Sequence, residues 1–128
     1  MTLLIVEHDK ATAWTLSEGL ARDGHTITTV TRGADALRTV EQNAYDTCLM
    51  ADDPLDMPGA HLALTLHHAD PSLTIIAMTS ADAPLHMDAR DRLGVTEVVV
   101  KPFSLATMRA LLVRVCDSPE STELRRAA

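Results

Sequence analysis

A lysine, Lys101, directly follows the apolar run Val98-Val99-Val100 and precedes Pro102 and Phe103. The run is typical of a buried strand, and a lysine at its end needs an anionic partner or water, because an unpaired buried charge is costly. In open α/β sheets, ligands bind outside the carboxyl ends of the strands. The position of Lys101 therefore predicts an anion site at that edge of a sheet.

Polar side chains also follow two other apolar runs. Glu7 and His8 come directly after the run 3–6, and Thr79 comes directly after the run 73–78. If these strands are neighbours, a carboxylate, a hydroxyl and the Lys101 ammonium meet in one shallow crevice. These are groups that a phosphoryl or divalent-cation site uses.

The composition describes a single domain of ordinary size. The chain has 128 residues and is 46% hydrophobic with one Trp, one Tyr and one Phe, so the core must be aliphatic. The net charge of −7 argues against direct nucleic-acid binding or binding to an anionic membrane. Cys48 and Cys116 lie in apolar segments and are expected to be buried, reduced thiols. With no signal peptide or spanning segment evident, we expect a cytoplasmic protein.

Short apolar runs alternate with helical patterns along the chain, which predicts a doubly wound α/β fold. Its five-stranded parallel sheet, (βα)5, should have the flavodoxin-like strand order 2-1-3-4-5. We expect the domain to span residues 1–117 and a flexible tail or linker stub to span 118–128. The expected strands are 3–6, 25–30, 47–50 with Ala51 as a candidate last residue, 73–78 and 95–100; the expected helices are 10–22, 33–43, 60–68, 84–93 and 105–116.

The chain resembles the receiver domain of two-component response regulators over residues 3 to about 116. The matching features are the apolar strand that runs into acidic residues, the spacing of 22 residues from Thr79 to Lys101, and several short motifs. These motifs are Gly33 with Ala36-Leu37, Tyr45-Asp46, Gly59 and Lys101-Pro102-Phe103. Together they are specific, although each alone is weak.

The resemblance implies roles for three residues. In the family, two neighbouring acidic residues after the first strand hold Mg²⁺, and Glu7 matches the first of them. An aspartate at the end of the third strand accepts a phosphoryl group from a histidine kinase. Thr79 and Lys101 match the hydroxyl and the lysine that contact the phosphoryl group.

Two departures from the family pattern predict an atypical receiver. His8 stands at the second acidic position, and counting back from Gly59 places Ala51 at the phosphoacceptor position. A methyl group cannot accept a phosphoryl group, and the loss of two carboxylates should weaken Mg²⁺ binding. We therefore expect a non-enzymatic protein-interaction module with no cofactor, in which Lys101 forms an internal ion pair with Glu7, Asp53 or Asp52.

Several alternatives remain open around the third strand. With a one-residue slip, Asp52 would end the strand and serve as a shifted phosphoacceptor, at the cost of repacking both faces. Asp53 could restore a carboxylate to the acidic pocket and ligate Mg²⁺ weakly with Glu7, or both aspartates could be solvated turn residues. A softer metal at His8 is a further alternative, as is a small doubly wound cofactor-binding protein or enzyme, which the acidic segment 7–11 disfavours.

The resemblance also implies partners. Receiver domains meet histidine kinases and downstream output proteins or domains, and they commonly pair through the surface of the fourth helix, fifth strand and fifth helix. In this chain that surface comprises residues 85–92, 96–100 and 104–114, and a homodimer through it is an expectation at the level of the family.

Overall fold

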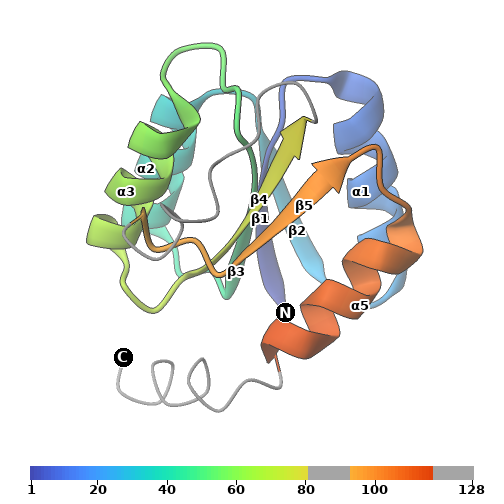
Figure 1. The fold of residues 1–128 in the computed structure, drawn as a ribbon. Helices are drawn as coiled ribbons and strands as arrows, with labels where there is room; N and C mark the ends of the chain where they lie inside the picture. Colours follow the sequence, from blue (N-terminus) through green and yellow to red (C-terminus); the bar gives the residue numbers. More distant parts are fainter. Residues whose placement is uncertain (81–92, 117–128) are drawn as a thin grey trace.

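Strands and helices alternate along the chain in the computed structural model, which describes residues 1–80 and 93–116 (Figure 1). The strands are β1 (Thr2–Val6), β2 (Thr26–Val30), β3 (Thr47–Ala51), β4 (Thr74–Ser80) and β5 (Glu97–Lys101). The helices of the described part are α1 (Lys10–Arg22), α2 (Gly33–Gln42), α3 (Gly59–Ala69) and α5 (Leu105–Cys116).

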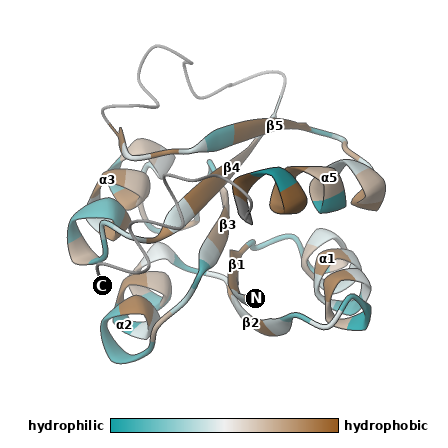
Figure 2. Cartoon of the chain, turned by 90° about the horizontal axis from the view of Figure 1, so that it is seen from below, coloured by the Kyte–Doolittle hydropathy of each residue, from teal (hydrophilic) through white to brown (hydrophobic). Residues whose placement is uncertain are grey.

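The strands form one parallel sheet in the order β2-β1-β3-β4-β5, which confirms the predicted topology. Helices α1 and α5 cover one face of the sheet, and α2 and α3 cover the other (Figure 2). Side chains alternate along each strand, so β3 sends Leu49 and Ala51 toward α1 and α5 and sends Cys48 and Met50 toward α2 and α3. All carboxyl ends lie at one edge of the sheet, as parallel strands require.

The bounds of the described elements agree with the sequence prediction within two residues. Two of the small differences matter for the site: β4 continues through Thr79 and Ser80, and β5 includes Lys101 as its last residue. The predicted helix at 84–93 falls almost wholly on residues 81–92, outside the described residues, as does part of the predicted partner surface. The predicted tail at 118–128 also lies outside them.

Local sequence explains where the helices begin and end. Gly24 follows α1 with a φ of 92°, a left-handed conformation that glycine adopts without steric cost. The Ser104 hydroxyl accepts a hydrogen bond from the backbone N–H of Thr107 at 3.1 Å and so caps the start of α5. None of the helices in the described residues is both long and apolar enough to cross a membrane.

The prediction that Cys48 is a buried, reduced thiol is confirmed. The side chain is fully buried in the middle of β3, and burial raises the pKa of the thiol to about 12. A thiol with so high a pKa stays protonated at neutral pH and is a poor nucleophile. The side chain of Cys116 lies outside the described part of the chain.

Candidate functional site

The third strand ends with a methyl group. Ala51 is the last residue of β3, is 1% exposed and pairs with Met78 of β4. It lies in the core between the sheet, α1 and α5, in the same cluster as Leu49. The one-residue slip that would bring Asp52 to the end of this strand is therefore wrong, because Asp52 is the first residue after it.

Lys101 forms the predicted internal ion pair, and its partner is Glu7. The Lys101 Nζ lies 2.8 Å from Glu7 Oε2, and the Glu7 side chain is 1% exposed, whereas that of Lys101 is 26% exposed. The other Glu7 oxygen, Oε1, accepts a hydrogen bond from the Asp9 backbone N–H at 3.2 Å. The buried carboxylate thus has a cationic and a neutral donor, which together offset its desolvation.

Asp52 reaches a different member of the predicted site. Its Oδ2 accepts a hydrogen bond of 2.6 Å from the Thr79 hydroxyl, and its backbone N–H donates to the Met78 carbonyl at 3.0 Å. The prediction of a purely solvated turn residue is therefore wrong for Asp52. Thr79 is fully buried in β4, so this hydrogen bond joins the loop after β3 to the neighbouring strand.

His8 and Asp53 form the outermost pair at this edge. The His8 Nε2 lies 3.5 Å from Asp53 Oδ2, and the two side chains are 30% and 65% exposed. The distance is that of an ion pair rather than of a good hydrogen bond, and it requires a protonated imidazole to be attractive. Asp53 therefore faces His8, at the rim of the crevice.

The acidic residues do not present a ready cation site. Mg²⁺ requires several oxygen ligands at near-octahedral geometry. Glu7 is already bonded to Lys101, and Asp53 lies beside His8. Within residues 1–80 and 93–116, no group of three or more His, Cys, Asp or Glu side chains is placed to hold a metal ion. The donor set of the described residues therefore does not fit Mg²⁺ without rearrangement.

Two further carboxylates lie at this edge: Asp9, which follows Glu7 and His8 in the chain, and Asp56, which the sequence analysis did not assign to the site. Asp9 precedes α1 and accepts a hydrogen bond from the Thr12 hydroxyl at 2.5 Å, which lowers the pKa of Asp9. Asp56 lies in the loop between β3 and α3, yet it accepts hydrogen bonds from Gly33 N–H at 2.8 Å and from Ala34 N–H at 3.0 Å, at the start of α2.

Asp56 therefore takes the place of a helix cap. The N–H donors of Ala34 and then Gly33 lower the pKa of Asp56, since they favour its ionised form. The residue at the cap position of α2 is Arg32, which offers no acceptor to the helix N-terminus. That mismatch was the one sequence signal that an acceptor must come from elsewhere.

Comparison with known proteins identifies the family. The sequence profile of the response regulator receiver domain matches residues 3–113. The chain belongs to this family, whose members are the receiver domains of two-component signal transduction.

Individual proteins are similar to this chain in sequence or in fold. The transcriptional regulatory protein CusR of Escherichia coli is 30% identical over 128 residues, which cover 100% of this chain and 53% of CusR. A CheY-like receiver domain protein of Methanospirillum hungatei superposes with a TM-score of 0.80 at 19% identity, over 99% of this chain and 98% of that chain. The structure of the response regulator TrrA of Thermotoga maritima, in complex with Mg(2+)-BeF, gives a TM-score of 0.74 at 22% identity, over 88% of this chain and 96% of that chain. The chain spans about half the length or less of the curated relatives it matches.

Proposed function

We propose that this chain is an atypical receiver domain that works without a phosphoacceptor aspartate, as a protein-interaction module. The observation that carries the proposal is the buried methyl group of Ala51 at the end of β3. A phosphoryl group needs a carboxylate oxygen to accept it, and Ala51 supplies none. In this proposal the domain is not an enzyme, and residues 1–117 form the receiver.

The pairing of the remaining polar groups supports the same proposal. Lys101 is bonded to Glu7, and Thr79 is bonded to Asp52. In a phosphorylated receiver, the positions of Lys101 and Thr79 contact the phosphoryl group. Here both are engaged with carboxylates of the chain itself, so we infer a conformation set by internal contacts and output controlled by partner binding.

The partners proposed for the module are a histidine kinase or a downstream output protein or domain. Two exposed valines on the predicted partner surface favour a protein contact there: Val100 on β5 is 50% exposed and Val113 on α5 is 62% exposed. A homodimer through this surface is part of the proposal. The acidic net charge of −7 supports a module that does not itself bind nucleic acid or an anionic membrane, and a cytoplasmic location is part of the proposal.

The rival function is a phosphorylatable receiver that uses Asp52, and one contact favours it. The carboxylate of Asp52 lies 2.6 Å from the Thr79 hydroxyl, the group that would contact a phosphoryl group in the family. In that case Mg²⁺ would bind weakly through Glu7 and Asp53, after the Lys101 and His8 contacts had broken.

Labelling separates the two functions. The full chain is incubated with radiolabelled acetyl phosphate and Mg²⁺, beside the variants Asp52→Ala and, as a matched control at an aspartate of the same loop, Asp56→Ala. We expect no stable label on any of the three. Label on the parent chain and on Asp56→Ala that is lost in Asp52→Ala would overturn the proposal in favour of the rival.

A second measurement tests the internally set conformation. Beryllium fluoride with Mg²⁺ mimics the phosphoryl group, and we expect it to leave the amide NMR signals of Glu7, Asp52, Thr79 and Lys101 in place. Saturable shifts of these signals would show that the crevice still receives a phosphoryl-like ligand.

A further inference from the structure

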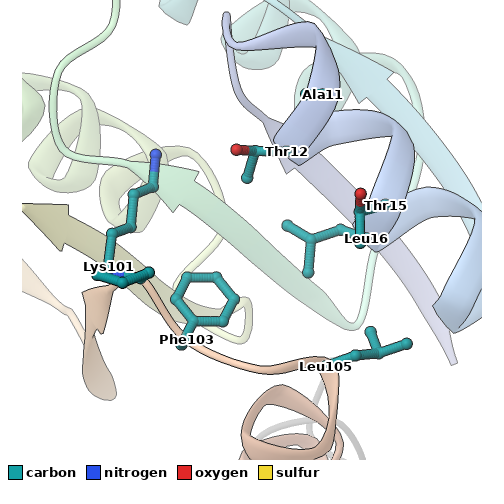
Figure 3. A pocket seen from close by; sticks show the side chains of 8 residues that line it. Ala11, Thr12, Thr15, Leu16, Lys101, Phe103 and Leu105 are labelled. Carbon is teal, nitrogen blue, oxygen red and sulfur yellow. The ribbon is translucent and has the colours of Figure 1, made fainter.

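A groove of about 500 Å³ lies between α1 and the segment that joins β5 to α5 (Figure 3). Thr12, Thr15 and Leu16 line it from α1, and Lys101, Phe103 and Leu105 line it from the other side. Small-molecule sites typically have volumes of roughly 300–1,000 Å³ and mostly apolar walls with a few polar groups. The groove has the size and lining of such a site.

The groups that line the groove are unevenly distributed, although the Thr15 hydroxyl lies beside Leu16 (Figure 3). The Lys101 ammonium and the Thr12 hydroxyl lie toward one end, and Leu105 lies toward the other (Figure 3). The ring of Phe103 borders the space between them and offers a flat apolar surface. An elongated, flat molecule with one polar end matches this arrangement.

Lys101 has hydrogen-bonding capacity left for a ligand. An ammonium group carries three N–H donors, and Lys101 gives one of them to Glu7 at 2.8 Å. Its Nζ has no second hydrogen-bond acceptor among residues 1–80 and 93–116. Because the side chain is 26% exposed, these donors can reach an acceptor in the groove.

The charges around this end decide what kind of acceptor fits. The single positive charge of Lys101 is already matched by the buried carboxylate of Glu7, and it also acts on the nearby carboxylate of Asp9. A second anion would therefore meet two carboxylates and one cation. A neutral oxygen takes the free Lys101 donors without that repulsion, and its bond to a charged donor is a strong one.

We propose that the groove binds a neutral, flat, mostly apolar molecule that carries a carbonyl oxygen at one end. The carbonyl accepts from Lys101, and the apolar body lies along Phe103 toward Leu105. Such a ligand touches both α1 and the β5–α5 segment, so the domain would respond to ligand binding. The proposal uses neither Ala51 nor Asp52 and stands independently of the proposed function.

Three probes with the same naphthalene body test which polar group the groove prefers: 2-acetylnaphthalene carries a neutral carbonyl, 2-naphthoate a carboxylate, and 2-ethylnaphthalene no polar group. Each is titrated into the full chain and followed by amide NMR shifts. We expect 2-acetylnaphthalene to give saturable shifts at Thr12, Thr15, Phe103 and Leu105. We expect it to bind about tenfold more tightly than the hydrocarbon, since a hydrogen bond to a charged donor contributes about 1.5 kcal/mol or more. It should also bind more tightly than the carboxylate.

A matched pair of variants locates the site. Thr15→Phe fills the groove from an exposed position of α1. Trp14→Phe places the same side chain at the preceding position, where Trp14 is 66% exposed and does not line the groove. We expect Thr15→Phe to abolish the shifts and Trp14→Phe to leave the dissociation constant unchanged. Unsaturable or scattered shifts, tighter binding of 2-naphthoate, or undiminished binding by Thr15→Phe would each overturn the proposal.

Discussion

Two ion pairs among the described residues at the carboxyl edge of the sheet differ sharply in their surroundings. Lys101 and Glu7 meet at 2.8 Å, with the glutamate 1% exposed, whereas His8 and Asp53 are 3.5 Å apart, with the aspartate 65% exposed. Water screens the outer pair and hardly reaches the inner carboxylate. Glu7 and His8 are neighbours in the sequence, yet we expect their ion pairs to contribute very differently to stability. The Glu7–Lys101 pair joins the ends of β1 and β5, whereas the His8–Asp53 pair lies at the rim of the crevice.

The largest expected effect comes from removing the cation of the inner pair. Lys101→Met leaves Glu7 buried without its ion-pair partner, and we expect the free energy of unfolding to fall by about 3–5 kcal/mol. Urea unfolding measures the change. Lys10→Met, at an exposed lysine, is the matched control and should have little effect.

The double variant Lys101→Met with Glu7→Gln sharpens this test. It removes both charges and should recover part of the lost stability, because no uncompensated carboxylate remains. If Lys101→Met were no more damaging than Lys10→Met, the inner pair would have no greater role than an ordinary surface contact.

Asp56 should give an intermediate effect, and its pH dependence identifies the cause. The backbone N–H groups of Ala34 and Gly33 lower the pKa of Asp56, so its contribution to stability is present above the ordinary pKa of an aspartate and is lost as the pH falls through the lowered value. We therefore expect Asp56→Asn to be less stable than the parent at neutral pH, with a gap that narrows in acid.

Thermal unfolding at a series of pH values, from pH 7 into the acid range, measures the difference in stability between the parent chain and Asp56→Asn. Glu18→Gln removes an exposed carboxylate from α1 and serves as the charge-matched control. If this difference in stability did not change with pH, Asp56 would stabilise the fold through its shape and not through its charge.

The smallest expected effect belongs to the outer pair. A double-mutant cycle with His8→Gln and Asp53→Asn should give a coupling energy below about 0.5 kcal/mol, as exposed ion pairs usually do. Added salt should reduce it further. A coupling energy as large as that of Lys101 and Glu7 would contradict the expected difference between the exposed pair and the buried pair.

The sequence predicted the scaffold because the apolar runs of a doubly covered parallel sheet are easy to recognise. It also predicted that Lys101 would pair internally, with Glu7 among three candidates, because the first and fifth strands end at the same edge of the sheet. The carboxyl end of β4 was harder to predict. Thr79 and Ser80 are polar, and a polar residue at the end of an apolar run fits a strand as well as a loop.

The contacts of the β3–α3 loop could not be predicted in the same way. Whether Asp52 reaches Thr79 depends on the path of the chain after Ala51, and residue alternation within the strand does not determine that path. Asp56 caps α2 only because the loop crosses to a helix 22 residues earlier in the chain. Such contacts follow from tertiary placement and leave little trace in local patterns.

The close approach of Gly59 to the backbone of Asp52 has a mechanical consequence. A Cβ at residue 59 would overlap the carbonyl group of Asp52, so the first turn of α3 rests directly on the residue that follows β3. Backbone against backbone leaves no flexible side chain to absorb a displacement. We therefore expect a displacement of the Asp52 carbonyl to displace the first turn of α3, and the helix with it.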